Sequence, residues 1–194
     1  MSGAESTPPS APFVDGQRLL LDPSASERGL RRMAGEILER SINHEEPLML
    51  IGIRRGGEPV AKRLAQWIGQ LENGATPPLG SVDITLYRDD AATALPNPRI
   101  GPSQIPERLE GRRVILVDDV CFTGRTVRAA IDALMDYGRP RRIELASLVD
   151  RFGRELPIQP DYCVRRIELP RDARVDVRET EQGLEAWLIE PSNQ

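Results

Sequence analysis

The segment VILVDDVCFTGRT, residues 114–126, decides the fold of this chain. It opens with four consecutive aliphatic residues, a pattern typical of a strand that is covered on both faces of a parallel sheet. Apolar residues then recur at helical spacing from Arg125 until Gly138, and glycine commonly ends a helix. A buried strand, a short polar loop and a helix in this order predict an α/β fold.

The polar centre of this segment predicts a site for a phosphorylated sugar. Asp118 and Asp119 follow the aliphatic run, and because burying two adjacent like charges is costly, we expect them at the open carboxyl end of the sheet, where α/β proteins bind ligands. The loop that follows consists of Thr123, Gly124, Arg125 and Thr126. Its backbone N–H groups open a helix and can hold a phosphate, while the carboxylates accept hydrogen bonds from sugar hydroxyls. These groups together describe a ribose 5-phosphate site, the alternative being an ordinary turn whose threonines only cap the helix.

A second loop of anion-binding composition follows a buried strand predicted at residues 47–53. It contains Arg54, Arg55, Gly56 and Gly57. The arginines bring positive charge, and glycine lets a ligand approach the backbone closely. We expect this loop at the same carboxyl edge of the sheet as the Asp pair, although a plain turn is the alternative.

The remainder of the chain alternates between helix and strand patterns. Helices are predicted at residues 24–43, 58–71 and 125–138, and further strands at 81–88, 142–149, 161–164, 174–178 and 185–189. The alternation predicts a central, mainly parallel sheet with helices on both faces, and the last short strands are expected to form a small β-rich hood. Residues 89–111 form a long, proline-rich connection, which is typical of a functional lid.

Composition predicts one domain at residues 24–194, preceded by an arm. The 194 residues suit a single core, and 39% hydrophobic with only 4% aromatic residues means that this core is aliphatic. The serine, proline and alanine of residues 1–23 are typical of a disordered arm. No apolar window of about 18 residues, no secretory leader and no metal-type spacing of Cys121 and Cys163 occur, which indicates a reducing, cytoplasmic setting.

Charge is distributed unevenly along the chain. The net charge of -4 argues against a general nucleic-acid binder. Lys62 is the only lysine, so 25 of the 26 basic residues are arginines. Residues 139–178 contain ten arginines and seven acidic residues, so this part carries +3 while the remainder carries -7. The C-terminal third therefore offers a basic face for polyanions, with an ordinary solvated face as the alternative.

Several stretches together resemble one protein family. The segment 114–126 and the stretches at 50–65, 81–90, 132–151 and 154–162 look like PyrR, described as a bifunctional pyrimidine operon attenuation protein and uracil phosphoribosyltransferase. The resemblance spans residues 25–180. It implies the type I phosphoribosyltransferase fold, with a small β-rich hood beside the main sheet. It also implies the reaction of uracil with phosphoribosyl pyrophosphate (PRPP) to give UMP and diphosphate.

The resemblance assigns roles to the polar residues. Asp118, Asp119 and Arg88 are the implied catalytic residues, and the 123–126 loop holds the phosphate of PRPP or UMP. The 54–57 loop binds pyrophosphate, in this family often through a non-proline cis peptide, with Tyr87 and Arg88 covering it. The implied base pocket consists of Val120, Arg151, Tyr162 and Cys163, where composition alone would make Tyr162 a core aromatic.

The resemblance also implies a cofactor, an assembly and a partner. Mg²⁺ accompanies PRPP and is bound mainly through it, and the chain is expected to form a homodimer or higher homo-oligomer. The family binds pyr mRNA when loaded with UMP. Arg154 and Arg165 match basic positions of the RNA face, but its two histidine positions are Gly35 and Gly153 here. We therefore hypothesise that PRPP chemistry is kept while pyr RNA is bound weakly or not at all.

Two other functions stay open at this stage. One is a non-catalytic regulator that senses PRPP or UMP by binding. The other is a phosphoribosyltransferase for another base, although Phe122 stands where purine enzymes of this superfamily often have Asp. Cys121 lies inside the 114–126 segment and is interpreted as a small apolar filler rather than a reactive thiol.

Overall fold

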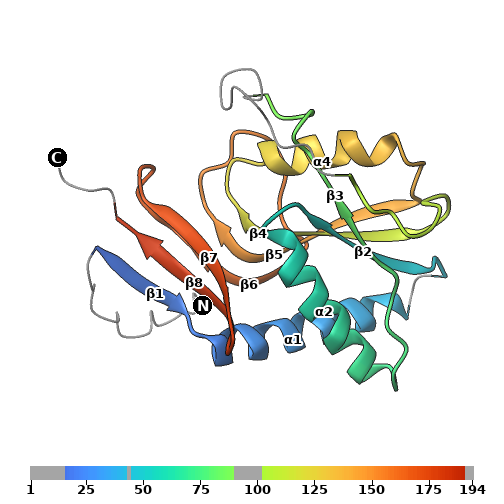
Figure 1. Cartoon of the computed structure of the whole chain (residues 1–194), viewed down its shortest axis with the longest axis horizontal. Helices are drawn as coiled ribbons and strands as arrows, with labels where there is room; N and C mark the ends of the chain where they lie inside the picture. Colours follow the sequence, from blue (N-terminus) through green and yellow to red (C-terminus); the bar gives the residue numbers. More distant parts are fainter. Residues whose placement is uncertain (1–15, 43–44, 90–101, 191–194) are drawn as a thin grey trace, which may run out of the picture.

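The computed structural model describes residues 16–42, 45–89 and 102–190. Its centre is a five-stranded, all-parallel sheet with the strand order β3-β2-β4-β5-β6 (Figure 1). The strands are β2 (Leu48–Ile53), β3 (Leu79–Val82), β4 (Arg113–Cys121), β5 (Arg142–Arg151) and β6 (Tyr162–Ile167). The aliphatic run of residues 114–117 lies in the central strand β4, as the sequence predicts for a strand covered on both faces.

Helices cover both faces of this sheet. The helices α1 (Pro23–Ser41) and α2 (Gly57–Leu71) lie on one face, and α4 (Arg125–Met135) lies on the other (Figure 1). Alternate side chains of β4 divide between the two sides: Ile115 packs in the core cluster with α1 and α2, whereas Leu116 packs in the cluster with α4. The strand period of two therefore produces two aliphatic cores.

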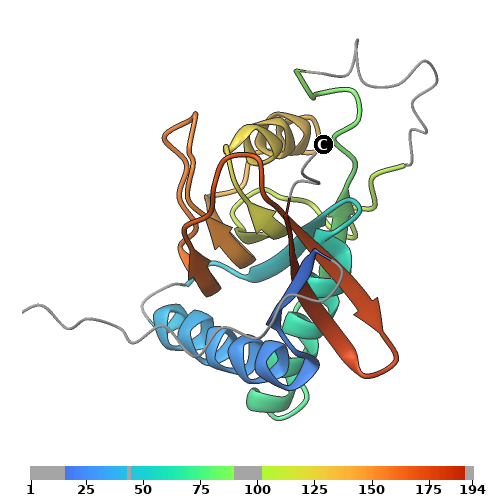
Figure 2. The same cartoon turned by 90° about the vertical axis from the view of Figure 1, so that its left-hand side faces the viewer.

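A separate three-stranded antiparallel sheet forms the hood (Figure 2). It consists of β1 (Gln17–Leu21), β7 (Arg174–Thr180) and β8 (Gly183–Ile189), in the order β1-β8-β7. The hood packs on α1, and β7 also approaches β4. No helix in the described part of the chain is long and apolar enough to span a membrane.

The predicted N-terminal arm of residues 1–23 extends too far along the chain. Residues 17–21 form β1, which pairs with β8, because Leu20 and Leu21 bury their side chains in the core shared with α1. Within the described ranges, no strand close in the sequence is available to pair with residues 17–21. Their pairing partner is β8, which lies near the opposite end of the chain. Residues 1–15 lie outside the described residues.

Two predicted strands are corrected by the structure. The strand expected at 81–88 ends at Val82, because Asp83 Oδ1 accepts a hydrogen bond from the Thr85 N–H at 2.8 Å and turns the chain. The strand expected at 161–164 does not belong to the hood. It is β6 at the edge of the main sheet, where it pairs in parallel with β5. Of the expected lid at 89–111, residues 90–101 lie outside the described residues.

Candidate active site

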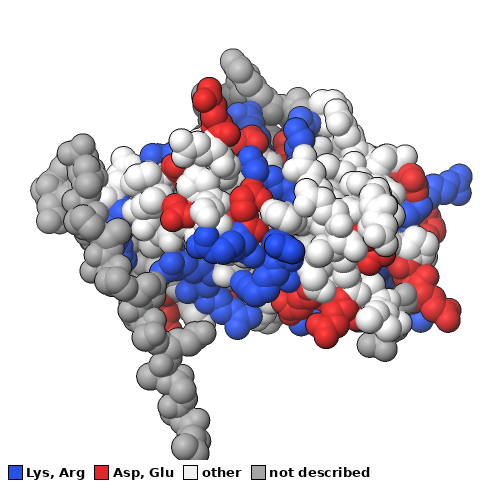
Figure 3. All heavy atoms as spheres, turned by 90° about the horizontal axis from the view of Figure 1, so that it is seen from below, with Lys and Arg blue, Asp and Glu red and all other residues white. Residues whose placement is uncertain are grey.

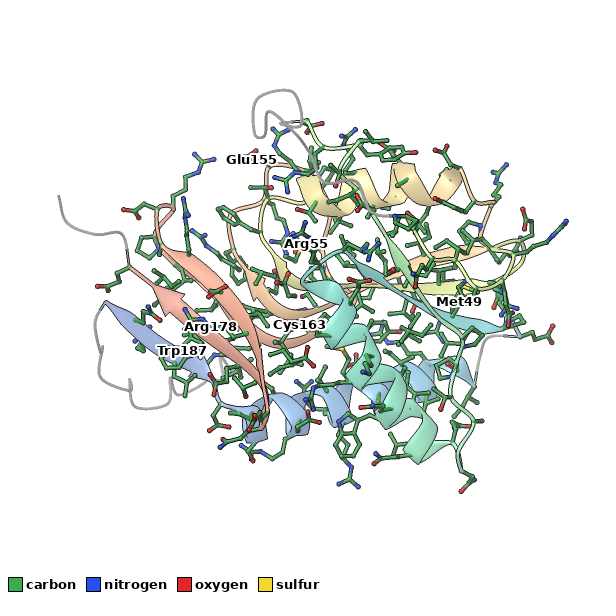
Figure 4. The ribbon with its side chains drawn as sticks, in the orientation of Figure 1. Met49, Arg55, Glu155, Cys163, Arg178 and Trp187 are labelled. Carbon is green, nitrogen blue, oxygen red and sulfur yellow. The ribbon has the colours of Figure 1, made fainter. Side chains whose placement is uncertain are left out.

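The carboxyl ends of neighbouring strands bring the predicted loops to one edge of the sheet. Strands β2 and β4 are adjacent and parallel, so the 54–57 loop after β2 and the Asp118–Asp119 pair of β4 lie at the same edge. Strand β5, on the other side of β4, ends there at Arg151. Figure 4 shows Arg55 toward this edge and Met49 toward the opposite end of β2. This is the edge at which α/β proteins bind ligands.

The 54–57 loop packs directly against the Asp pair. A Cβ atom added to Gly56 would lie 2.1 Å from Asp119 Oδ2, and one added to Gly57 would lie 2.1 Å from the Val117 carbonyl oxygen. Both distances are far below van der Waals contact. A side chain at position 57 would meet the β4 backbone, and one at position 56 would displace the Asp119 carboxylate from its place in this structure. The two predicted anion-binding elements therefore meet, as the sequence predicts.

The arginines of the 54–57 loop leave positive charge at this edge. The peptide bond between Arg54 and Arg55 is cis, which is the geometry that the resemblance implies. Arg54 pairs with Glu58 at 3.3 Å and donates to the Pro102 carbonyl oxygen at 2.7 Å. Arg55 is exposed. Because Arg55 reaches solvent next to the Asp pair, an anionic ligand at this edge has a cation within its surroundings.

The two carboxyl groups differ in burial although they are adjacent in β4. Asp118 is 4% exposed and Asp119 is partly buried. Asp118 Oδ1 accepts from the Asp119 N–H at 3.0 Å, and Asp119 Oδ1 accepts from the Val120 N–H at 2.8 Å. Burial, and then the charge of Asp119, raise the pKa of Asp118 well above its usual value. The site therefore combines one buried carboxyl group, which resists losing its proton, with a second carboxyl group that is more accessible to solvent.

The 123–126 loop opens helix α4 as an anion site. Gly124 is the N-cap, with φ at +90°, and has no side chain that could cap the first turn. Glycine is favoured there because a side chain strains this left-handed backbone. The Arg125 N–H is hydrogen-bonded to Thr123 Oγ1 at 3.3 Å. Because the N-cap residue is a glycine, the N–H groups that follow Arg125 in the first turn have no side-chain cap from it and can bind a phosphate.

Salt bridges surround the 123–126 loop. Two of their residues, Arg128 and Glu155, were not predicted from the sequence. Arg125 pairs with Glu155 at 2.7 Å and with Asp89 at 2.8 Å. Arg128, one turn further along α4, also pairs with Asp89, at 2.5 Å. The spacing of three residues from Arg125 on a predicted helix could have identified Arg128, whereas Glu155 is brought in only by the tertiary fold.

The residues next to the expected lid point in two directions. Arg88 is exposed, as is Asp89 beside it. The Tyr87 hydroxyl donates to the Asp136 carboxylate just beyond α4. The Tyr87 side chain is therefore directed toward the end of α4 in this structure.

Two of the four predicted base-pocket residues lie at the candidate site. Val120 belongs to the last part of β4, and Arg151 ends β5. The Arg151 guanidinium lies 3.8 Å from the centre of the Phe122 ring and donates to the carbonyl oxygens of Pro170, at 2.7 Å, and Arg171, at 2.9 Å. Arg151 therefore links the 114–126 segment to the chain that leads into the hood.

Tyr162 does not join the site, which corrects its predicted place in the base pocket. Tyr162 is 1% exposed, and its hydroxyl donates to Glu144 Oε2 at 2.7 Å and accepts from Arg113 Nη2 at 2.8 Å. These partners lie toward the amino end of the sheet, because Arg113 is the first residue of β4. Burial, and then the contact with Glu144, raise the pKa of Tyr162 to about 12. Tyr162 is a core residue, the alternative that composition favours.

Neither cysteine has the surroundings of a reactive thiol. Cys163 lies in β6 opposite Ser147, and burial raises the pKa of its thiol. Cys121 is buried, and burial raises the pKa of its thiol to about 12. A protonated, buried Cys121 fits its interpretation as a small apolar filler, because the thiolate is the reactive form.

Arg154 lies beneath the 123–126 loop and does not belong to an exposed RNA face. Its side chain is 13% exposed and pairs with Asp150. Its remaining hydrogen bonds run to backbone carbonyl oxygens of residues 121, 122, 151 and 158. An arginine whose donors are used in this way cannot also contact a phosphate backbone. The predicted RNA contact at Arg154 is therefore corrected.

An arginine face does lie on the side of the molecule where α1 runs. Figure 3 shows Lys and Arg side chains gathered there in one group. Arg32 of α1 donates to the carbonyl oxygens of residues 163 and 164, which joins α1 to β6. Arg28 lies one helical turn before Arg32, and Arg165 and Arg166 belong to β6. We define the arginine face as the exposed residues Arg28, Arg32 and Arg166. Arg165 is half-buried and donates to the Leu20 carbonyl oxygen at 2.8 Å, so its predicted RNA contact is corrected.

The two glycines at expected histidine positions differ in the space around them. A Cβ atom on Gly35 would meet nothing within 4 Å. At Gly153 the φ angle is +132°, and a Cβ atom would lie 2.3 Å from Phe122 Cε2. A histidine at position 153 is therefore incompatible with the Phe122 ring where it lies in this structure.

Metal ligands are sparse at the site. Among the described residues, no group of three or more His, Cys, Asp or Glu side chains could hold a metal ion. Asp118 and Asp119 offer carboxylate oxygens, the ligand type that Mg²⁺ prefers. Because two side chains do not complete an octahedral shell, a Mg²⁺ ion at this edge needs further oxygen ligands, from water or from a bound substrate.

A family model and sequence relatives agree with these features. Residues 17–180 match the model of the phosphoribosyl transferase domain. The bifunctional protein PyrR of Geobacter sulfurreducens is 51% identical over 80% of this chain and 86% of its own. That of Thermoanaerobacter sp. strain X514 is 47% identical over 81% and 88%. That of Roseiflexus sp. strain RS-1 is 44% identical over 90% and 95%.

Solved structures share the fold at lower identity. A purine phosphoribosyltransferase from Pyrococcus horikoshii superposes with a TM-score of 0.55 at 25% identity, covering 77% of this chain and 89% of its own. A hypoxanthine-guanine-xanthine phosphoribosyltransferase superposes with a TM-score of 0.62 at 16% identity, covering 92% and 98%. At 16% identity the second likeness shows the fold alone.

Proposed function

We propose a function from the premise that this chain belongs to the PyrR family of phosphoribosyltransferases. The chain transfers the ribose 5-phosphate group of PRPP to uracil, giving UMP and diphosphate, and regulates pyrimidine genes by binding pyr mRNA in the presence of UMP. One observation carries the catalytic part of the proposal. The 54–57 loop, the Asp pair and the 123–126 loop lie at one edge of the sheet, with Gly56 packed against Asp119.

The sugar binds to the Asp pair near the end of β4, and its phosphate binds to the 123–126 loop that follows. N–H groups at the start of α4 hold the 5-phosphate, because the glycine N-cap of that helix provides no side-chain cap. Asp118 and Asp119 accept hydrogen bonds from the ribose hydroxyls. The anomeric carbon gains positive charge as its bond to pyrophosphate stretches, and the nearby carboxylate charge of Asp119 stabilises that cation. No covalent nucleophile is needed.

The leaving group departs toward the 54–57 loop. Diphosphate carries developing negative charge, which Arg55 and the loop backbone stabilise. Mg²⁺ would be held by the diphosphate of PRPP and by the Asp pair, and it would supply further charge neutralisation for the leaving group. Arg88 remains a proposed catalytic residue on the strength of the resemblance, and its side chain is exposed.

The base is bound between the end of β4 and the hood side of the site. Val120 and Arg151 line this region, and Phe122 lies under the Arg151 guanidinium. Phe122 has no group that could hydrogen-bond the imidazole nitrogen of a purine, which favours a pyrimidine. A phosphoribosyltransferase for another base is the alternative, and a panel of bases in the same assay separates the two.

The decisive experiment measures UMP formation from uracil and PRPP with Mg²⁺. We expect turnover by the wild-type chain and a loss of at least about a hundredfold for Asp118→Asn/Asp119→Asn, because the charge facing the developing cation is removed. Asp176→Asn is the matched control, since this carboxylate pairs with Arg178 in the hood at 2.7 Å. Absence of wild-type turnover, with UMP still bound, would instead identify a PRPP or UMP sensor.

The regulatory part of the function places RNA on the arginine face. Arg28, Arg32 and Arg166 are exposed and come from two elements that touch, α1 and β6. Arginine is well suited to phosphate groups because its donors form a planar fork. With glycine at positions 35 and 153, binding relies on these arginines rather than on histidines, and we expect it to be correspondingly weaker.

A further inference from the structure

We propose that Arg154 is a positioning residue that holds the 123–126 loop in its phosphate-binding conformation, an inference that rests on the function proposed for that loop. Arg154 itself touches neither phosphate nor sugar in this role. It acts through the carbonyl groups of Cys121 and Phe122, which directly precede the loop, from the side opposite to the N–H groups. Arg154 therefore controls the affinity for the 5-phosphate without controlling the affinity for pyrophosphate.

Each of the three nitrogen atoms of the Arg154 guanidinium donates to an acceptor near the loop. Its Nη1 donates to the carbonyl oxygens of Cys121 at 3.3 Å and Phe122 at 2.5 Å, and to that of Arg151 at 2.9 Å. Its Nε donates to the Ile158 carbonyl oxygen at 2.7 Å, and Nη2 pairs with the Asp150 carboxylate. With the side chain 13% exposed, this arginine works inside the protein.

The backbone next to Arg154 continues the same pattern. The N–H groups of Glu155 and Leu156 both donate to the Thr123 carbonyl oxygen, at 3.0 Å and 3.1 Å. Three consecutive carbonyl groups, those of residues 121, 122 and 123, are therefore held by one short segment.

The direction of these three carbonyl groups also fixes the direction of the N–H groups next to them. In a trans peptide unit the carbonyl of one residue and the N–H of the next point in opposite directions. Holding carbonyls 121–123 on the side of Arg154 therefore directs the N–H groups of residues 122–124 to the other side. Helix α4 begins there with a glycine N-cap, which offers no side-chain cap, so these groups and the helix N-terminus can face one anion.

Packing fixes the distance between the two segments. A Cβ atom on Gly124 would lie 3.3 Å from Ile158 Cβ and 3.4 Å from Leu156 Cβ, so the 156–158 chain fits closely beneath the N-cap. Gly153 lets the Phe122 ring lie against the chain at the other end of the segment. Residues 153–158 thus form a continuous support for the loop.

Lysine cannot replace arginine in this position. The guanidinium reaches acceptors in several directions within one plane, and Arg154 uses all three of its nitrogen atoms. A lysine ammonium is a single point with three donors and cannot satisfy the Ile158 carbonyl, the Asp150 carboxylate and the loop carbonyls together. Arg154→Lys therefore keeps the charge but loses the geometry, which separates the two contributions.

The test compares ligands that use different loops. In the UMP-forming assay we expect Arg154→Lys to raise KM for PRPP and the inhibition constant of UMP at least tenfold, while the inhibition constant of pyrophosphate changes less than twofold. Arg141→Lys is the matched control, because Arg141 also pairs with an acid, Glu46 at 3.8 Å, but is 74% exposed and lies beside the amino end of β5. It should leave all three constants unchanged. Equal changes for UMP and pyrophosphate, or none, would overturn the proposal.

A second variant and a direct binding measurement keep the test independent of folding and of turnover. Asp150→Asn preserves shape but weakens the ion pair that orients Arg154, so it should shift the UMP constant in the same direction by a smaller factor. Calorimetric titration of the full chain with UMP and with pyrophosphate does not require catalysis. If the wild-type chain lacks turnover, selective loss of UMP binding in Arg154→Lys still supports this inference, and unchanged UMP binding overturns it.

Discussion

Asp118 shows at the residue scale how the ligand site conflicts with stability. The carboxyl is 4% exposed and stands beside Asp119, and burial together with that neighbouring charge raises its pKa well above the usual value. A raised pKa for an acid means that the folded protein binds the proton more tightly than the unfolded chain does. Stability from this group is therefore fully present below the unfolded pKa and decreases as the pH rises.

We predict that Asp118→Asn stabilises the protein in a pH-dependent way. Above about pH 4 the unfolded chain ionises Asp118 while the folded chain retains the proton, so the wild type loses up to about 1.4 kcal/mol per pH unit that the Asn variant keeps. The advantage stops growing once the folded carboxyl ionises. Thermal unfolding of both proteins from pH 4 to pH 8 measures this difference. A difference in stability between the two proteins that stays constant or shrinks as the pH rises would contradict this prediction.

Helix α1 shows at the element scale how one helix meets different demands along its length. Gly29 faces β6, where a Cβ atom would lie 2.1 Å from Val164 Cγ1, whereas Gly35 has nothing within 4 Å. Both glycines lie in the helix interior, where glycine disfavours the helical state relative to alanine. Glycine is thus required for packing at position 29, whereas at position 35 it only lowers the stability of the helix.

The same substitution should therefore have opposite effects at these two positions. Gly35→Ala should raise the free energy of unfolding by about 0.5–1 kcal/mol, because it removes backbone entropy from the unfolded chain. Gly29→Ala should lower it by about 1–3 kcal/mol, because the added methyl group overpacks against Val164. Urea unfolding of the two variants beside the wild type tests this. Stabilisation at both positions would show that β6 can move away from α1.

The whole molecule separates its charges more than a net value of -4 suggests. The arginine face lies along α1 and β6, whereas the reacting edge combines arginines with the Asp pair. Under the proposed function, two kinds of anion are therefore bound at two places on one chain. An extended polyanion fits the face, and a small phosphorylated sugar fits the edge.

Salt dependence of pyr RNA binding should follow the arginine face. We expect Arg28→Ala and Arg166→Ala each to weaken binding of the pyr leader with UMP and to reduce the slope of log K against log salt by about 1, since each removes one phosphate contact. Arg141→Ala is the control, because this arginine is 74% exposed but lies beside the amino end of β5. Gel shift at several salt concentrations measures the slopes, and equal losses in all three variants would contradict a local face.

Prediction from sequence succeeded where the information is local. The 114–117 run, the helix from Arg125 and the glycines of the 54–57 loop each carry a pattern within a few residues, and the structure has the expected elements there. Prediction failed where a partner is distant. Residues 17–21 become a strand only through β8, and the 161–164 segment joins the main sheet only through β5.

The sequence by itself determined that a buried strand ends in two acids and a helix-opening loop, because hydrophobic period and residue type dictate those features. It also determined the family. Only the tertiary structure decided which arginines face solvent and which act inside. Arg154 and Arg166 both pair with Asp150, yet Arg154 is 13% exposed and donates to the carbonyl oxygens of residues 121 and 122, while Arg166 is 64% exposed. Burial and acceptor geometry, which depend on segments distant in the chain, make that distinction.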